Sequence, residues 1–178
     1  MRTLIATVAL LLVAPASVWA QNTDQESQGL GYLFIGAGSH QMGPNSGFGG
    51  EYIDKSGLGV GAELATAGWN TSANGNLNWI GLGSADLSYH VFRKKMQGYA
   101  PLVEGGYTIF FGQDTDTPGG NKTNGFNVGG GVDLFASKHI GARFDVRYNG
   151  HGGRILWASF PNLSQFSFVA FRIGVTFR

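Results

Sequence analysis

The sequence predicts an all-β protein, an eight-stranded antiparallel up-and-down β-barrel that spans a membrane. The last segment, 165–177, alternates apolar and polar side chains to its end, so one face is wholly apolar and the other carries Arg172. Roughly eight such segments follow one another, which is the minimum for a transmembrane barrel. The chain has 30 glycines, 13% aromatic residues, 13% charged residues and no cysteine. This composition suits strands whose outer face meets lipid, and it disfavours disulfide-rich and nucleic-acid-binding proteins.

The first twenty residues have the features of a secretory signal peptide. Arg2 gives a positive start, residues 4–13 form a short apolar run, and Val18-Trp19-Ala20 supplies the residues that signal peptidase reads. We expect cleavage after Ala20, which divides the chain into a signal peptide (1–20), a flexible lead-in (21–29) and an outer-membrane barrel (30–178). A retained membrane anchor is the alternative, and it is disfavoured because the apolar run is short.

Connectors rich in glycine, asparagine, serine or lysine separate the expected strands, which are 30–40, 47–54, 58–66, 78–92, 99–112, 125–136, 140–149 and 165–177. The connectors at one end are short, namely 55–57, 93–97 and 137–139. Those at the other end are mostly longer, namely 41–46, 67–77, 113–124 and 150–164. Outer-membrane barrels show this alternation, with the short turns in the periplasm.

The alternation within each strand predicts which side chains face lipid. In 140–149, for example, Phe144 and Val146 share an apolar face opposite Asp145 and Arg147. Aromatic residues on the apolar faces gather near strand ends and predict a girdle at each membrane interface. The expected loop-end girdle is Trp79, Phe111, Phe126 and Tyr148, and the expected turn-end girdle is Tyr52, Tyr89, Tyr99 and Phe177. In a soluble β-protein the same aromatics would be ordinary core residues. Segment 30–40 is ambiguous because two apolar sets compete, so its orientation stays open.

The polar faces predict a charge network inside the barrel. A three-residue turn at 137–139 places Asp133 across from Arg143, and the turn at 55–57 places Glu51 across from Gly61. The same count around 93–97 brings Asp86 across from Glu104, a repulsive pair that needs a cation from across the lumen. The predicted network is Glu51, Glu63, Asp86, Glu104, Asp133, Arg143, Asp145, Arg147 and Arg172. Because side chains can fill so narrow a barrel, we expect a plugged lumen rather than a pore, a proton relay or an ion relay.

The signal peptide, the alternating strands, the glycine-rich stretch 57–64 and the ending Phe171-Arg172-Ile173-Gly174-Val175-Thr176-Phe177 together resemble the small OmpA/OmpX-type outer-membrane barrel superfamily. The resemblance covers the whole mature chain as a pattern rather than as a fixed motif. It implies a bacterial outer-membrane location, contact with lipid and lipopolysaccharide, and insertion by the barrel-assembly machinery. That machinery reads a terminal phenylalanine in this family, whereas here Arg178 follows Phe177. The resemblance also implies a role in membrane integrity or in adhesion through the loops.

The sequence offers little support for catalysis or for a cofactor. Ser88 and His90 with Asp86 are the nearest set to a hydrolytic site, but they face the lumen near the turn end, away from lipid acyl chains. Asp114-Thr115-Asp116 begins like a calcium loop, but Gly125 stands where an EF-hand needs glutamate. We therefore expect a non-enzymatic protein without a cofactor or a metal.

Connector 150–164 is markedly apolar for a surface loop, since it contains Ile155, Leu156, Trp157, Phe160 and Leu163. We expect it to fold over the barrel rim, and the alternative is contact with a surface partner or with lipid.

Three functions remain open at this point. The favoured one is a structural or surface-contact barrel. The second is a barrel that passes small hydrophobic molecules into the membrane, for which an apolar lumen pocket would be the distinguishing feature. The third is a soluble periplasmic lipocalin-like binder, in which the apolar face would line a ligand cavity.

Overall fold

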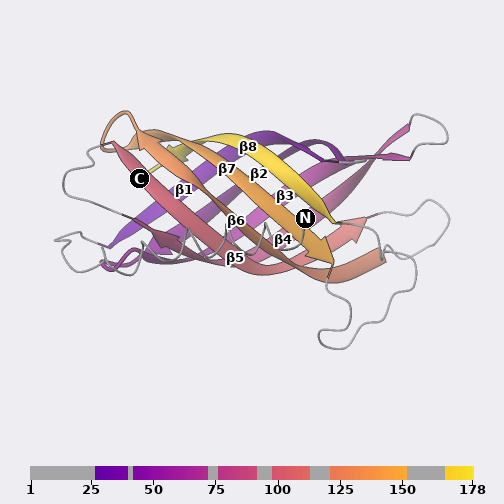
Figure 1. Cartoon of the computed structure of the whole chain (residues 1–178), viewed down its shortest axis with the longest axis horizontal. Helices are drawn as coiled ribbons and strands as arrows, with labels where there is room; N and C mark the ends of the chain where they lie inside the picture. The colour runs from indigo at the N-terminus through magenta and orange to yellow at the C-terminus, as the bar shows by residue number, and fades with distance from the viewer. Residues whose placement is uncertain (1–26, 40–41, 72–75, 92–97, 113–120, 152–166) are drawn as a thin grey trace, which may run out of the picture.

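The computed structural model describes residues 27–39, 42–71, 76–91, 98–112, 121–151 and 167–178. These residues form eight antiparallel strands that close into one barrel (Figure 1). The strands are β1 (Gln28–Gly38), β2 (Met42–Ile53), β3 (Leu58–Thr71), β4 (Asn76–His90), β5 (Tyr99–Gly112), β6 (Asn121–Phe135), β7 (Ile140–His151) and β8 (Phe168–Phe177). Each strand pairs with its neighbours in the sequence, and β8 returns to pair with β1. The expected eight-stranded up-and-down architecture is confirmed.

Most strands extend further towards the loop end than the sequence pattern predicts. β2 begins at Met42, β3 runs on to Thr71 and β6 begins at Asn121, so strand replaces much of the expected connectors. Glycine, serine and asparagine read as loop residues in a sequence, but a closed sheet pairs their backbone groups from both sides. β1 and β8 are shorter there than expected, since β1 ends at Gly38 rather than at 40 and β8 begins at Phe168 rather than at 165, and β5 ends at Gly112 as expected.

The predicted alternation of loop lengths is therefore wrong for the first half of the chain. Residues 39–41 and 72–75 join strands at the loop end and are no longer than the turns 54–57 and 136–139. In the second half the turn-end connection 91–98 is as long as the loop-end connection 113–120, so 152–167 is the one loop-end connection between these strands that is longer than every turn-end connection. At the N-terminal end, β1 starts at Gln28, inside the expected lead-in 21–29. The predicted signal peptide and residues 21–26 lie outside the described residues, and so does nearly all of the apolar connector 150–164, whose first two residues belong to β7.

Two predicted strand registers are confirmed and one is wrong. Asp133 pairs with Arg143, and Glu51 pairs with Gly61, as the turn lengths indicate. Glu104, however, pairs with Ser88 rather than with Asp86. The ladder between β4 and β5 already ends at His90, so the connection between them is longer than the predicted turn at 93–97. The observed register between β4 and β5 differs from the predicted one by two residues. A shift of two leaves every side chain on its predicted face of the sheet, so the prediction was wrong only about the cross-strand partners.

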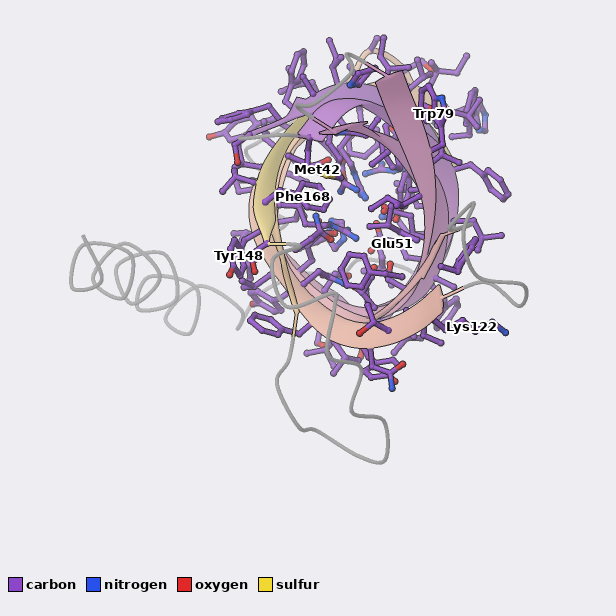
Figure 2. The ribbon with its side chains drawn as sticks, turned by 90° about the vertical axis from the view of Figure 1, so that its right-hand side faces the viewer. Met42, Glu51, Trp79, Lys122, Tyr148 and Phe168 are labelled. Atoms are coloured by element: carbon purple, nitrogen blue, oxygen red, sulfur yellow. The ribbon has the colours of Figure 1, made fainter. Side chains whose placement is uncertain are left out.

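Large apolar side chains cover the outside of the barrel, while the charged side chains of the network and two smaller apolar clusters lie inside it. Figure 2 shows Trp79 and Tyr148 pointing outward and Glu51 pointing into the lumen. The orientation of β1, which the sequence left open, is also settled. Tyr32 and Phe34 are buried inside, and Leu33 and Ile35 are exposed outside. The lipocalin-like alternative required the alternating apolar face to line the interior, and these strands turn that face outward instead. Among the described residues there is no helix long and apolar enough to cross a membrane.

The turn between β2 and β3 requires glycine at position 57. Gly57 has a φ of 91°, and a Cβ at this position would run into the carbonyl oxygen of His90. The Asp54 carboxylate accepts hydrogen bonds from the backbone amides of Ser56 and Leu58, at 2.8 and 3.0 Å. The Ser56 hydroxyl donates to the same carboxylate at 2.6 Å and holds the pKa of Asp54 below its usual value. The positive φ of Gly57 and the nearby carbonyl oxygen of His90 both disfavour a side chain at this position.

We expect Gly57→Ala to lower the free energy of unfolding by about 1–3 kcal/mol, because alanine is strained at a positive φ. The measurement is the urea midpoint of the purified barrel. Gly29→Ala is the matched control, since a Cβ there meets no atom within 4 Å. Equal midpoints for the two variants would contradict the strained-turn explanation.

Candidate functional site

The barrel interior holds all nine residues of the predicted charge network. The carboxylates are Glu51, Glu63, Asp86, Glu104, Asp133 and Asp145, and the guanidiniums are Arg143, Arg147 and Arg172. No side chain among the nine is more than 7% exposed. They divide into two groups along the lumen. We call Glu51, His90, Asp133 and Arg143 the turn-end cluster, and the other six network residues the central cluster.

Arg143 organises the turn-end cluster. Its guanidinium donates from Nε to Asp133 Oδ1 at 2.8 Å and from Nη2 to Asp133 Oδ2 at 2.9 Å. Nη2 also donates to Glu51 Oε1 at 2.6 Å, which links β7 to β2 across the lumen. The other oxygen of Glu51 accepts from the Ser88 hydroxyl at 2.7 Å and lies 3.0 Å from His90 Nε2. Arg143 therefore neutralises two carboxylates in a geometry that is bidentate to one of them.

Arg147 and Arg172 share the carboxylates of the central cluster. Arg147 donates to Glu104 at 2.8 Å, to Asp86 at 3.2 Å and to Glu63 at 3.3 Å. Arg172 donates to Asp145 at 2.5 Å, to both oxygens of Glu63 at 2.9 Å and to Glu104 at 3.2 Å. Each guanidinium thus contacts three carboxylates, and Glu63 and Glu104 each bind both. The cation predicted between Asp86 and Glu104 is Arg147.

Several lumen residues in this network were absent from the sequence prediction. The Tyr32 ring lies under the guanidinium of Arg143 at 4.5 Å, and the Phe34 ring lies under that of Arg172 at 4.4 Å. The Tyr32 hydroxyl donates to Glu63 at 3.0 Å. Asn127 donates to Asp86 at 2.7 Å. Strand alternation had placed Asn127 on the polar face, but it gave no signal for the two aromatics, because rings in β1 read equally well as lipid-facing.

The turn-end cluster has the residue types of a metal site, but it does not fit one. Glu51, His90 and Asp133 offer ligand atoms within 4.8 Å of one another. The Arg143 guanidinium already binds both carboxylates, so a metal ion would meet its positive charge at close range. Ser88 and His90 both contact Glu51 rather than a space that a substrate could enter, and they are 7% and 1% exposed. The turn-end cluster is therefore an internal ion-pair network rather than a metal site or a hydrolytic site.

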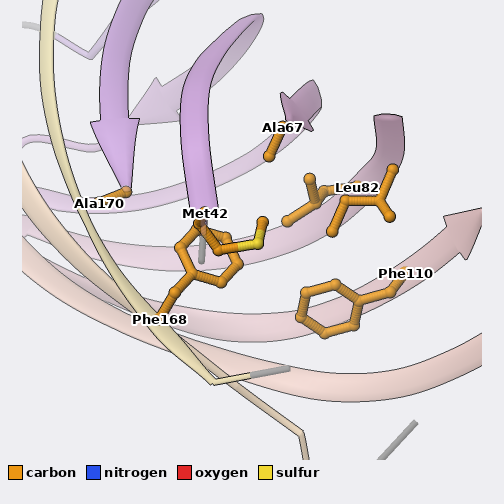
Figure 3. Close-up of a cluster of buried hydrophobic side chains, with 7 residues drawn as sticks. Met42, Ala67, Leu82, Phe110, Phe168 and Ala170 are labelled. Carbon is orange, nitrogen blue, oxygen red and sulfur yellow. The ribbon is translucent and has the colours of Figure 1, made fainter. Parts of the chain in front are cut away.

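Beyond the central cluster, towards the loop end, a group of apolar side chains is buried in the lumen. We call this group the loop-end cluster; its members are Met42, Ala67, Ile80, Leu82, Phe110, Phe168 and Ala170. Figure 3 shows the side chains of Met42 and Phe168 on one side and those of Leu82 and Phe110 on the other. Each strand that contributes here also contributes polar lumen residues closer to the turn end. Polar residues are buried at this level too, since Thr123 pairs with Phe110 and Asn149 with Phe168. A second apolar cluster, Leu30, Tyr32, Phe34 and Ile53, lies on β1 and β2.

The predicted girdle aromatics lie on the outer face near the strand ends. Seven are exposed, namely Trp79, Phe111, Phe126, Tyr148, Tyr52, Tyr99 and Phe177, and Tyr89 is half-buried. The Phe126 and Tyr148 rings, on neighbouring strands, lie 5.8 Å apart. Arg178, which follows the last strand, stacks on the ring of Phe135 at 3.3 Å.

Comparison with solved structures shows what the barrel resembles. It is similar to the N-terminal β-barrel domain of Pseudomonas aeruginosa OprF, with a TM-score of 0.60 and 17% identity over 86% of this chain and 97% of that one. It is also similar to neisserial surface protein A, with a TM-score of 0.56 and 14% identity over 85% of this chain and 94% of that one. For Ail, the attachment invasion locus protein of Yersinia pestis, in complex with the heparin analogue sucrose octasulfate, the TM-score is 0.50 and the identity 12%, over 86% and 99% of the two chains.

At these low identities the similarity shows the fold alone. The fold is the one that the resemblance to the small OmpA/OmpX-type barrels implies. No protein-family model and no curated protein sequence matches the chain.

Proposed function

We propose that the chain is a non-enzymatic integral protein of the bacterial outer membrane, with a lumen plugged by its own side chains. The observation that carries the proposal is the outer face of the barrel. Residues such as Leu33, Phe48, Leu87 and Phe171 are each more than half exposed and recur around the whole barrel. Water-soluble proteins rarely expose apolar surface on this scale, whereas a lipid bilayer requires it.

The lumen clusters support the plug. An eight-stranded barrel is just wide enough for side chains to fill it. The ion pairs run across the lumen, for example from Arg172 on β8 to Glu63 on β3, so they tie opposite walls together. Every network side chain is nearly inaccessible to water, which argues against a conducting pore and against an ion or proton relay.

The aromatic girdles and the two ends of the barrel suggest how the barrel is oriented in the membrane. Aromatic residues at the loop end and the turn end match the two interfaces of a bilayer, with lipid and lipopolysaccharide as the outer partners. In this orientation the short turns face the periplasm, and the last strand faces the barrel-assembly machinery during insertion. Cleavage of the signal peptide near Ala20 belongs to the same proposal.

The biological role that we propose is membrane integrity or surface contact through the loop-end connections. One structural neighbour is named as an attachment invasion locus protein and another as a surface protein, which makes contact a reasonable role to test. A partner site on 150–164 is part of this proposal and rests on the apolar composition of that connector. In cells that lack the protein, lost resistance to detergents would support integrity, and lost adherence with normal resistance would support contact.

The first test is fractionation followed by gel migration. We expect the protein in the outer-membrane fraction, with a band in SDS that shifts when the sample is boiled, because closed barrels resist SDS until they are heated. A periplasmic protein whose band does not shift would refute the membrane barrel.

A further inference from the structure

The outer belt of large apolar side chains is shorter along β2 and β3 than along β5. The exposed large apolar residues fall within 48–52 on β2, within 58–64 on β3 and within 99–111 on β5. All three stretches begin beside a turn, so the difference lies at the loop end. Each residue of a tilted barrel strand rises about 2.5 Å along the barrel axis. The belt is therefore about 30 Å high at β5 and about 15 Å high at β3.

Two hydroxyl side chains lie on the outer face where the belt ends at β2 and β3. Ser46 and Thr66 are cross-strand partners, both are exposed, and their hydroxyl oxygens lie 3.5 Å apart. They follow the paired apolar residues Phe48 and Leu64 in the direction of the loop end. A hydroxyl can donate one hydrogen bond and accept two, so a single long contact between them leaves most of that capacity unused. Hydrocarbon would offer these hydroxyls no other partner, whereas water and lipid headgroups would.

The strand register shows which outer residue of β5 lies at the same height as Ser46. A path through paired residues that starts at Gln28 crosses all eight strands and returns to β1 at Gly38, ten residues nearer the loop end. Partners on successive strands, taken from β1 to β8, therefore climb about 3 Å each towards the loop end. Three such steps lead from Ser46 to Phe111, which is about 9 Å higher. Tyr107, four residues back along β5, is thus level with Ser46.

We propose that the outer face of β2 and β3 contacts the lipid headgroup layer from Ser46 and Thr66 onwards, while the same level of β5 lies in hydrocarbon. At Tyr107 the apolar belt continues towards the loop end through Ile109 and Phe111. At Ser46 the belt has already ended. A bilayer that matches both edges is thinner beside β2 and β3 than beside β5. The inference rests on the membrane-spanning arrangement proposed above and adds the shape of the bilayer that the barrel imposes.

The test is the depth of nitroxide labels, which are simple to place because the chain has no cysteine. Ser46→Cys and Tyr107→Cys are labelled in the barrel refolded in dioleoyl phosphatidylcholine vesicles, with Lys138→Cys in the exposed turn as the water reference. We expect a water-soluble nickel chelate to relax the label at 46 nearly as strongly as the one at 138, and to leave the one at 107 unrelaxed. A label at 46 as deep as the label at 107, or deeper, would overturn the inference and leave the membrane barrel standing. Full access of the chelate to both would refute the membrane barrel itself.

A second experiment extends the belt on its short side. Ser46→Leu combined with Thr66→Leu adds one pair of apolar residues at β2 and β3. This double variant should raise the urea midpoint more in thick dioleoyl bilayers than in thin dilauroyl ones, because it reduces the mismatch only where the bilayer is thick. Ser46→Thr combined with Thr66→Ser exchanges the two hydroxyl side chains and should leave both midpoints unchanged. Equal shifts of the leucine variant in the two bilayers would contradict a thinned bilayer. The heat shift of the same samples on SDS gels reports separately whether each variant is folded.

Discussion

Replacement of Arg172 by methionine is expected to lower the free energy of unfolding by about 3–5 kcal/mol, the usual result of breaking a buried ion pair from one side. Arg172 contacts Asp145, Glu63 and Glu104, and its guanidinium also covers the Phe34 ring. Methionine fills similar space but leaves Asp145 without its guanidinium partner. Glu63 and Glu104 would then have Arg147 as their remaining guanidinium partner among the described residues. The measurement is urea unfolding of the refolded barrel, or the temperature at which its gel band shifts.

Two variants control this experiment. Lys122→Met makes the same kind of change at an exposed position on β6 and should leave stability within about 0.5 kcal/mol of wild type. Arg172→Lys keeps the charge but loses the planar fork, so it should fall between wild type and methionine. If Arg172→Met unfolds at the same temperature as Lys122→Met, the ion pairs do not stabilise the barrel.

Replacement of Ile173 by arginine is expected to destabilise the barrel in lipid vesicles by about 2–4 kcal/mol. Ile173 lies midway along β8 and is 48% exposed on the outer face, where a bilayer would surround it with hydrocarbon. Arginine at this site needs no change in the packing inside, so any large effect comes from the surroundings of the barrel.

The matched control is Ile140→Arg at the first residue of β7, where Ile140 is 51% exposed beside the turn. Near an interface the cost of arginine falls to about 0–1 kcal/mol. A soluble barrel would tolerate both changes to within about 0.5 kcal/mol, because both side chains would face water. Equal small effects at the two positions would therefore refute the membrane-spanning arrangement.

The alternation of side chains was sufficient to predict the fold and to place the charged residues. In β7, Arg143, Asp145 and Arg147 alternate with apolar residues without interruption, so the inner face could be assigned with no knowledge of the neighbours. Turn length then gave the partner across the sheet wherever the turn was tight, as it is for Asp133 and Arg143. These features are local, and a local sequence pattern is enough to read them.

What could not be predicted depends on contacts between distant strands. Tyr32 and Phe34 point inward because their rings lie under Arg143 and Arg172, which belong to β7 and β8. The partners of Glu51, which are His90, Ser88 and Arg143, come from β4 and β7 across the lumen. The loop-end cluster was missed because its members are spread over five strands. In no single strand do they differ from ordinary apolar residues.

The three lumen guanidiniums all come from the end of the chain, Arg143 and Arg147 from β7 and Arg172 from β8, whereas β2 to β6 each contribute one lumen carboxylate. The first six strands alone therefore supply five lumen carboxylates and none of the three described lumen guanidiniums. The two strands that close the sheet, β7 and β8, are also the strands that neutralise the lumen. A barrel that lacked them would be both open at its edge and unbalanced in charge.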